Sequence, residues 1–311
     1  MFASVDLTGS TAFKQRESAS TERPWQFHFE DFFKNFPGAV HEAYTESAAF
    51  QCKEKLRVWK VQGDEILFEC PLTRFEEVVP HIRALKSAAS EYNTLNQRKG
   101  VRSLCKVTAW TAGFPVTNTE VRIPSPGGEV NDYLGPSIDI GFRLTRHATP
   151  RKFVISLELA LLLLDAWQKL PDLDPPSYYF EEPRRLEGVL RCDAYPLIWI
   201  DLDDGKPSLE EQLQGLRRKP CDSDRLRQYC HRFLRENGWH PPFIDGDPHE
   251  RYGLIPPELE ERRAALKKQA RLREKNEATG RPVDQTKGDS TLIDQVGELP
   301  PDLGEVDRNE D

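Results

Sequence analysis

Two carboxylates stand where the chain is expected to turn. Asp6 ends an alternating segment that begins at Phe2 and lies just before Gly9, and Asp64 follows Gly63 between two β-rich runs. If these strands are neighbours, both carboxylates meet at one sheet edge, where their oxygens can bind a hard divalent cation. An Asp in a hairpin turn is more often only a turn residue, so this pair needs support from other parts of the chain.

A short Gly/Ser/Thr segment lies beside the first carboxylate. Thr8, Gly9, Ser10 and Thr11 lead into a predicted helix, whose first turn would direct free backbone N–H groups at a phosphate. The simpler alternative is an ordinary Ser or Thr helix cap. The segment lacks the lysine spacing of a Walker loop.

A third polar cluster occupies residues 132–143. A helix over 135–147 would place Asp139 and Arg143 four residues apart on one face. As an exposed ion pair the two would contribute only about 0.3–0.5 kcal/mol to stability. As a functional group, the planar and permanently charged guanidinium of Arg143 matches phosphate oxygens.

Alternating strands and helices must position these residues. We expect strands over 2–6, 56–61, 65–70, 104–113, 153–156, 189–190 and 197–200, a Pro/Gly-rich loop over 124–128, and helices from Ser10, over 24–47, 73–97 and 135–147, and around 159–164. The runs on either side of Gly63 predict a direct hairpin. The predicted class is therefore α/β, as an α+β sandwich with helices on a mixed, largely antiparallel sheet.

The C-terminal third differs in composition from the rest. We expect a catalytic domain over 1–204, a helical and loop extension over 205–257, and a charged helix with a disordered acidic tail over 258–311. Of the 51 acidic and 43 basic residues, nine and two lie in 282–311, which leaves 42 and 41 elsewhere. The chain thus lacks the basic character typical of sequence-independent nucleic-acid binding.

Cysteine usage and hydropathy indicate the compartment. The six cysteines have no CxxC spacing, which favours reduced thiols in a cytoplasmic protein. The longest apolar stretch, 153–164, contains Glu158 and is shorter than the roughly 20 residues that cross a bilayer. We therefore expect a soluble protein without a signal peptide or a membrane partner.

The three clusters occur in an order that resembles the class III nucleotidyl cyclases, the family of adenylyl and guanylyl cyclases. Their opening motif, F-x-D-[IL]-x-G-[FS]-T, is matched closely over 6–11 and loosely at Phe2. Their hairpin motif, K-x-x-G-D, is matched over 60–64, and their helix motif over 132–143, with Asp139 where many members have Asn. The resemblance spans residues 1–203 and implies the cyclase catalytic fold.

The resemblance also implies a metal site and a phosphate site. Asp6 and Asp64, with the backbone carbonyl of Leu7, would hold two divalent ions, Mn²⁺ or Mg²⁺. The segment 8–11 would contact substrate phosphates, and Arg143 would stabilise charge on the α-phosphate.

Two further positions would read the base and one would orient the ribose. Lys60 and Asp132 fall where family members contact the base, and Asp139 falls where the Asn orients the ribose. A carboxylate accepts hydrogen bonds but does not donate them, so the role of position 139 differs from that of Asn.

The implied reaction is attack of the ribose 3′-hydroxyl on the α-phosphate of a nucleoside triphosphate, which releases pyrophosphate. In this family the active site lies between two catalytic domains. Because this chain carries both halves of the site, the resemblance implies a homodimer with two equivalent sites.

The hydrogen-bonding groups restrict the base only in part. A donor at Lys60 and an acceptor at Asp132 suit adenine, cytosine and uracil, and disfavour guanine. A pyrimidine would need a pocket narrowed by bulk, and Trp59, Tyr133 and Phe50 are the candidates. The alternative is that these rings only pack on the sheet.

The short chain without fused sensor also resembles the pyrimidine cyclases of bacterial Pycsar anti-phage defence. That resemblance implies a uridylate cyclase whose product, cyclic UMP, acts on a separate effector. The alternatives are a cytidylate cyclase, then an adenylate cyclase, and then a catalytically silent module that binds a nucleotide or a partner.

Overall fold

The computed structural model describes residues 1–17, 24–44, 52–101, 103–170, 173–188, 194–203, 213 and 219–278. Met1–Arg263 form one compact unit, and a second unit begins at Ala264. Phe50 and the strand expected at 189–190 lie outside the described residues.

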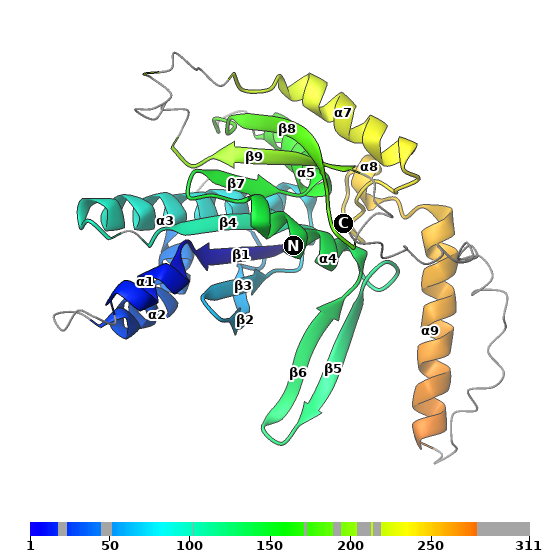
Figure 1. Cartoon of the computed structure of the whole chain (residues 1–311). Helices are drawn as coiled ribbons and strands as arrows, with labels where there is room; N and C mark the ends of the chain where they lie inside the picture. Colours follow the sequence, from blue (N-terminus) through cyan, green and yellow to red (C-terminus); the bar gives the residue numbers. More distant parts are fainter. Residues whose placement is uncertain are drawn as a thin grey trace, which may run out of the picture. The chain divides into compact units, whose positions relative to one another are not determined.

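The centre of the first unit is a seven-stranded mixed sheet (Figure 1). Its strands lie in the order β2 (Arg57–Gln62), β3 (Glu65–Glu69), β1 (Phe2–Leu7), β4 (Cys105–Trp110), β7 (Lys152–Ile155), β9 (Ala194–Asp201) and β8 (Tyr178–Arg185). Only β4 and β7 pair in parallel, and the other neighbours are antiparallel. The predicted mixed, largely antiparallel α+β fold is confirmed.

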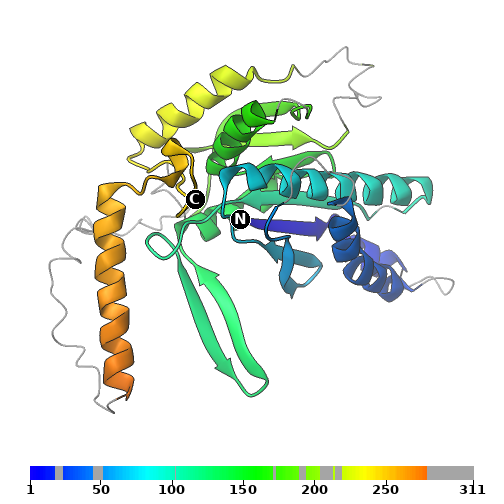
Figure 2. The ribbon, with the colours of Figure 1, turned by 180° about the vertical axis from the view of Figure 1, so that it is seen from behind.

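Helices α2 (Trp25–Ala43), α3 (Val78–Arg98) and α5 (Leu157–Lys169) cover one face of this sheet, as the rear view shows (Figure 2). The helical elements are α1 (Ser10–Glu17), α2 (Trp25–Ala43), η1 (Phe75–Glu77), α3 (Val78–Arg98), α4 (Pro136–Leu144), η2 (Thr145–His147), α5 (Leu157–Lys169), α7 (Ser223–Glu236), α8 (Glu250–Gly253) and α9 (Pro257–Ala278). The main core joins the sheet to α2, α3 and α5, whose apolar stripes recur at helical spacing.

The alternation of β1 separates the core from the site. Ala3, Val5 and Leu7 point toward the helices and are at most 2% exposed. Asp6 therefore points to the opposite face, because successive strand residues alternate between faces. On that face Phe2 belongs to a second, smaller apolar cluster.

Helix α4 lies against this second face, over β4. Glycine is required at position 141, because a Cβ there would lie 2.2 Å from ring atoms of Trp110. The close approach places the helix that carries Asp139 and Arg143 on the same face as Asp6.

The structure corrects one expectation about a loop and shows one strand that the sequence did not predict. The segment treated as a loop over 124–128 is the end of a hairpin, in which β5 (Thr119–Ser125) pairs with β6 (Gly128–Leu134). The strand that was not predicted is β8, at Tyr178–Arg185, which pairs with β9. Its charged second half and Pro183 conceal the alternation by which a strand is usually recognised.

Part of the C-terminal extension packs on the first unit. Helix α7 buries Leu226, Cys230 and Leu234. The backbone N–H of Phe75 donates to Asp247 at 2.6 Å. Residues 219–263 thus belong to the same compact unit as the sheet.

Two smaller expectations concern cysteines and membranes. Each cysteine at a described position is a free thiol. Among the helices of the described residues, none combines the length and the apolar character that crossing a bilayer requires.

Candidate active site

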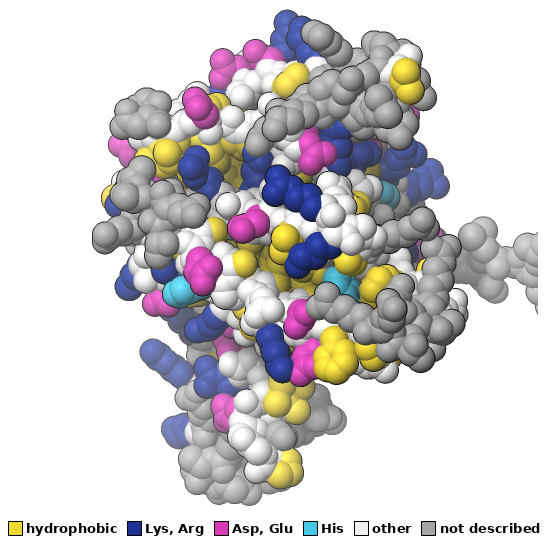
Figure 3. Space-filling view, turned by 90° about the vertical axis from the view of Figure 1, so that its left-hand side faces the viewer, with side chains coloured by type: hydrophobic (Ala, Val, Ile, Leu, Met, Phe, Trp, Pro, Cys, Tyr) yellow, Lys and Arg dark blue, Asp and Glu magenta, His cyan; other side chains and the backbone are white. Residues whose placement is uncertain are grey.

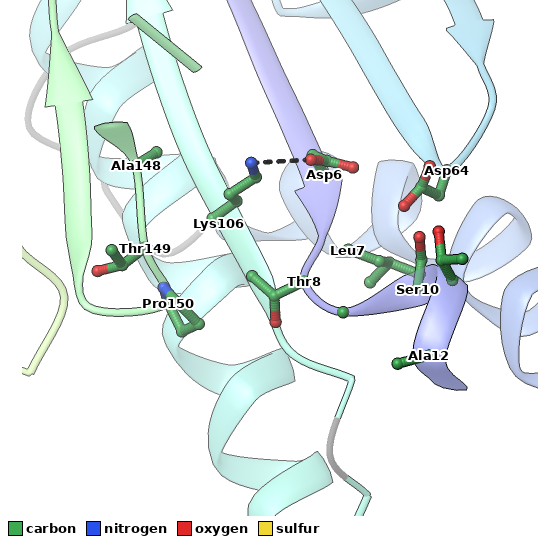
Figure 4. A pocket seen from close by; sticks show the side chains of 12 residues that line it. Asp6, Leu7, Thr8, Ser10, Ala12, Asp64, Lys106, Ala148, Thr149 and Pro150 are labelled. Atoms are coloured by element: carbon green, nitrogen blue, oxygen red, sulfur yellow. Dashed lines mark ion pairs between the residues drawn. The ribbon is translucent and has the colours of Figure 1, made fainter. Parts of the chain in front are cut away.

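The end of β1 and the β2–β3 turn bring the two predicted carboxylates together. Asp6 pairs with Glu65 in the antiparallel ladder, so Asp64 in the adjoining turn lies beside it. Gly63, at φ +65°, makes this tight turn, and Gly9, also at φ +65°, turns the chain from β1 into α1. Figure 4 shows Asp6 and Asp64 directed toward one pocket.

A lysine that the sequence analysis missed completes this group. Lys106 on β4 lies opposite Asp6, and its Nζ is 3.0 Å from Asp6 Oδ2 and 3.3 Å from the carbonyl oxygen of Thr145. Lys106 and Asp64 flank Asp6 on opposite sides (Figure 4). The signal that could have revealed it is a lysine within an otherwise buried central strand.

The pocket has a volume of about 560 Å³ and contains the predicted phosphate segment. Its lining includes Asp6, Leu7, Thr8, Gly9, Ser10, Thr11, Asp64 and Lys106. Helix α1 begins at Ser10, as expected, so its N-terminal end borders the pocket. The Thr8 hydroxyl donates to the Leu104 carbonyl at 3.0 Å, so its proton is already engaged.

Asp6 is a partly buried carboxylate with one positive and one negative neighbour, Lys106 and Asp64. Burial raises the pKa of the Asp6 carboxyl, Lys106 opposes the increase, and Asp64 adds to it. A bound cation would relieve the repulsion between the two carboxylates. Asp6 and Asp64 fit a hard divalent ion chemically, and Leu7, whose side chain is buried in the core, could contribute only its backbone carbonyl.

The rest of the expected ligand set is sparse. The described residues contain no group of three or more His, Cys, Asp or Glu side chains arranged to hold a metal. Two protein carboxylates are typical of sites in which phosphates and water complete the coordination of Mg²⁺. Figure 3 views the side toward which β1 runs, where Lys and Arg are interspersed with Asp and Glu.

The two predicted base-reading residues contact each other. Lys60 Nζ lies 2.8 Å from Asp132 Oδ1, and about a third of each side chain is exposed, 34% and 35%. Burial alone would raise the pKa of Asp132, but hydrogen bonds from Lys60 and from the Tyr133 N–H outweigh it and lower the pKa.

A β-bulge gives Lys60 its direction. Val58 pairs with Phe68 and Lys60 with Leu67, so Trp59 is an extra residue in β2. A bulge redirects the side chains that follow it. Lys60 therefore shares the face of Leu67, where the second apolar cluster lies, and its ammonium sits 4.1 Å from the centre of the Trp59 ring.

Two of the three candidate pocket-narrowing rings adjoin this pair. Trp59 and Tyr133 meet edge to face with centroids 5.1 Å apart, and both pack on Phe2. The indole N–H of Trp59 donates to the Asn131 carbonyl at 3.1 Å. The third ring, Phe50, lies outside the described residues.

Helix α4 holds the remaining two predicted residues. Asp139 lies in its first turn and Arg143 in its last. No ion pair joins them, and Arg143 Nε donates to the Glu187 carbonyl at 2.8 Å. Among the described residues, the terminal nitrogens of Arg143 have no hydrogen-bond partner, which leaves its fork open to an anion.

Within one chain the predicted residues fall into separate groups. No hydrogen bond or ion pair among the described residues connects Asp6 or Asp64 with Lys60, Asp132 or Arg143. The structure thus brings Asp6 and Asp64 together and, separately, Lys60 and Asp132, for which base reading is a prediction.

Comparison with solved structures finds nucleotide cyclases. The guanylyl cyclase Cya2 is 16% identical, with 67% of this chain and 93% of that chain covered and a TM-score of 0.42. The adenylyl cyclase CyaB from P. aeruginosa is 10% identical, covering 64% and 91%, with a TM-score of 0.45. The guanylate cyclase domain of RhGC from Catenaria anguillulae, in complex with GTP, is 8% identical, covering 64% and 93%, with a TM-score of 0.45.

Comparison of the sequence gives no relative. No protein-family model matches the chain, and no curated protein matches it.

Proposed function

We propose that this chain is a nucleotidyl cyclase that converts a pyrimidine nucleoside triphosphate, first of all UTP, to its 3′,5′-cyclic monophosphate and pyrophosphate. The observation that carries the proposal is the pocket in which Asp6 and Asp64 meet beside Lys106 and the N-terminal end of α1. Two carboxylates, an ammonium and a helix N-terminus are the groups that a metal-bound triphosphate requires.

The residues of the pocket would bind and orient the triphosphate. Asp6 and Asp64 would hold one or two divalent ions, with the Leu7 carbonyl as a further oxygen ligand. Such ions, when bound, supply positive charge that stabilises the attacking hydroxyl and the leaving pyrophosphate. Lys106 would exchange its contact with Asp6 for the phosphate oxygens, and the backbone N–H groups at 9–11 would donate hydrogen bonds to further phosphate oxygens.

The second group would act on the base and the α-phosphate. Lys60 and Asp132 would bind the edge of the base, Arg143 would place its free fork on the α-phosphate, and Asp139 would accept a hydrogen bond from the ribose. Because the two groups are not connected within one chain, we propose that a second copy supplies the missing group. The working form would be a symmetric homodimer with two sites.

Hydrogen bonding to Lys60 and Asp132 does not separate uracil, cytosine and adenine, so the size of the base would decide which nucleotide is the substrate. Uracil would donate its N3–H to Asp132 and accept from Lys60, whereas cytosine would donate its amino group and accept at N3. Adenine offers the same edge on a larger ring. Trp59, which the bulge holds next to Lys60, supports the smaller bases, and cytidylate cyclase is the nearest alternative.

The biological role rests on resemblance to the pyrimidine cyclases of anti-phage defence. In that role the cyclic nucleotide would be a second messenger for a separate effector. The chemistry proposed above does not depend on it.

Incubation with each of the four ribonucleoside triphosphates tests the function. The purified chain is mixed with Mn²⁺ or Mg²⁺, and the products are compared with cyclic standards by chromatography. We expect cyclic UMP, none in the presence of a chelator, and none from the Asp64→Asn variant. Cyclic AMP as the main product would reject the pyrimidine assignment, and no cyclic product from any nucleotide would reject the cyclase itself.

A further inference from the structure

The base-reading pair connects two sheets that share no backbone pairing. Lys60 belongs to β2 of the seven-stranded sheet, and Asp132 belongs to β6 of the two-stranded sheet. The relative position of the two side chains therefore depends on side-chain contacts between the sheets rather than on a strand ladder.

Three consecutive residues of β6 make these contacts. The carbonyl of Asn131 accepts from Trp59, the carboxylate of Asp132 accepts from Lys60, and the Tyr133 hydroxyl donates to Glu69 on β3. A base bound between Lys60 and Asp132 would replace their direct contact, so the outer two contacts would have to hold β6 in place.

Tyr133 holds Asp132 directly. Its backbone N–H donates to Asp132 Oδ1 at 2.9 Å, while its own hydroxyl is bound to Glu69. Tyr133 thus links the carboxylate that would read the base to a fixed group on the main sheet.

Glu69 is well suited to anchor this link. Its side chain is only 14% exposed, and Arg57, its neighbour in the β2–β3 ladder, donates to it at 3.0 Å. An ion-paired carboxylate makes a stronger acceptor bond to a phenol than a neutral group does. Burial and the adjacent Glu69 both raise the pKa of Tyr133, so its hydroxyl remains a proton donor at neutral pH.

The Tyr133 ring is also confined. Phe2, Trp59 and Phe114 surround it with centroid distances of 5.0, 5.1 and 5.3 Å. A Tyr133→Phe variant therefore keeps this packing and loses only the hydroxyl.

We propose that Tyr133 and Glu69 are positioning residues for base selection, which hold Asp132 at the base edge once the base has replaced the direct contact between Asp132 and Lys60. The inference rests on the proposed function, because it requires that Asp132 reads a base. Neither residue contacts the reacting atoms.

Equilibrium binding tests this proposal without turnover. The α,β-methylene analogues of UTP, CTP, ATP and GTP are titrated calorimetrically into the full chain with Mn²⁺ present. We expect Tyr133→Phe and Glu69→Gln each to weaken binding of the preferred analogue by about tenfold and to reduce selectivity among bases. The double variant should be no weaker than either single variant, because both changes break the same link.

Two measurements separate this role from a merely structural one. Glu120→Gln is the matched control, because Glu120 on β5 lies opposite Tyr133 in the hairpin and no hydrogen bond joins it to the Tyr133 hydroxyl. It should leave all four affinities unchanged, and the titration of Mn²⁺ alone should be unaffected by every variant.

The outcomes distinguish the inference from the proposed function. Unchanged affinities and selectivity in both Tyr133→Phe and Glu69→Gln, with the wild-type chain binding normally, would overturn the positioning role alone. Binding of no analogue by the wild-type chain would overturn the proposed function and this inference with it.

Discussion

Asp6 and Lys106 face each other across β1 and β4, with the ammonium nitrogen 3.0 Å from a carboxylate oxygen. The lysine side chain is only 20% exposed, and the aspartate side chain is 24% exposed. The positive charge thus lies on the side of Asp6 away from Asp64, where it offsets the charge that would attract a cation, and it lines the same pocket in which a phosphate would bind.

Because of this ion pair, we expect removal of the lysine charge to strengthen metal binding and to weaken turnover of the nucleotide. Lys106→Met should bind Mn²⁺ alone more tightly than the wild-type chain, because the competing ammonium is gone. The same variant should lose about a hundredfold in kcat/KM, because a cation that stabilises the triphosphate is missing. Manganese titration and steady-state kinetics measure the two effects, with Lys34→Met, an exposed lysine on α2, as the control. A parallel loss of both would contradict this account.

Trp59 predicts a change in base preference. Trp59→Val removes the bulk beside Lys60, so kcat/KM for ATP relative to UTP should rise by about tenfold. Competition assays with mixed nucleotides measure this ratio. Phe27→Val, which alters a 56% exposed ring on α2, should leave it unchanged. An unaltered ratio in Trp59→Val would show that the ring only packs on the sheet.

Gly141 predicts a coupled loss of stability and turnover. In Gly141→Ala the new methyl group would lie 2.2 Å from Trp110 ring atoms, so α4 must move. We expect a loss of about 1–3 kcal/mol in the free energy of unfolding. The kcat should also fall, because α4 carries Asp139 and Arg143. Denaturant unfolding and steady-state kinetics measure the two effects.

Gly38, a glycine within helix α2, supplies the control for the Gly141 prediction. A Cβ at Gly38 in α2 meets no atom within 4 Å. Gly38→Ala should therefore change stability by at most about 1 kcal/mol, in the stabilising direction. Equal losses in both variants would contradict the close-packing argument.

The contacts of Asp165 with α7 and α8 predict that the packing of residues 219–263 contributes less to stability at low pH. Its carboxylate, 8% exposed, accepts from Arg227 on α7 and from Arg251 and Tyr252 on α8. Burial alone would raise the pKa of Asp165, but these donors outweigh it and lower the pKa. Asp165→Asn leaves Arg251 without its charge partner and leaves Arg227 paired only with the exposed Asp224, so unfolding should become easier by about 2–4 kcal/mol at neutral pH.

The direction of that pKa shift fixes the pH dependence. A lowered pKa means that the folded state favours the ionised form, so the stabilisation is complete above the unfolded value of about 4. It is lost as the pH falls through the folded pKa. The difference in melting temperature between the wild-type chain and Asp165→Asn should therefore shrink below about pH 4. A difference that stays constant from pH 7 to pH 3 would rule out this role of the carboxylate.

Much of the site could be predicted from sequence because it lies on local features. Gly9 and Gly63 mark the turns that present Asp6 and Asp64, and helix α4 begins one residue after Gly135. Such turns depend on backbone conformations that few residues other than glycine adopt readily, so the residue type predicts them.

The ion pair of Lys106 with Asp6 and the hairpin β5–β6 could not be predicted, for different reasons. The partner of Lys106 depends on the register between β1 and β4, which is a property of the folded sheet. In β6 the residues are mostly exposed on both faces, so the hairpin lacks the apolar alternation that predicts a strand. The bulge at Trp59 is likewise visible only in the pairing of β2 with β3.

Complementation between two inactive variants tests the shared site most directly. Asp64→Asn removes one group of the proposed site, and Arg143→Ala removes the other. Each variant alone should form a homodimer without turnover. After mixing in equal amounts and subunit exchange, about a quarter of the wild-type activity should return, because half of the dimers are mixed and each has one intact site. No activity from heterodimers verified by mass spectrometry would contradict a site built from two copies of this chain.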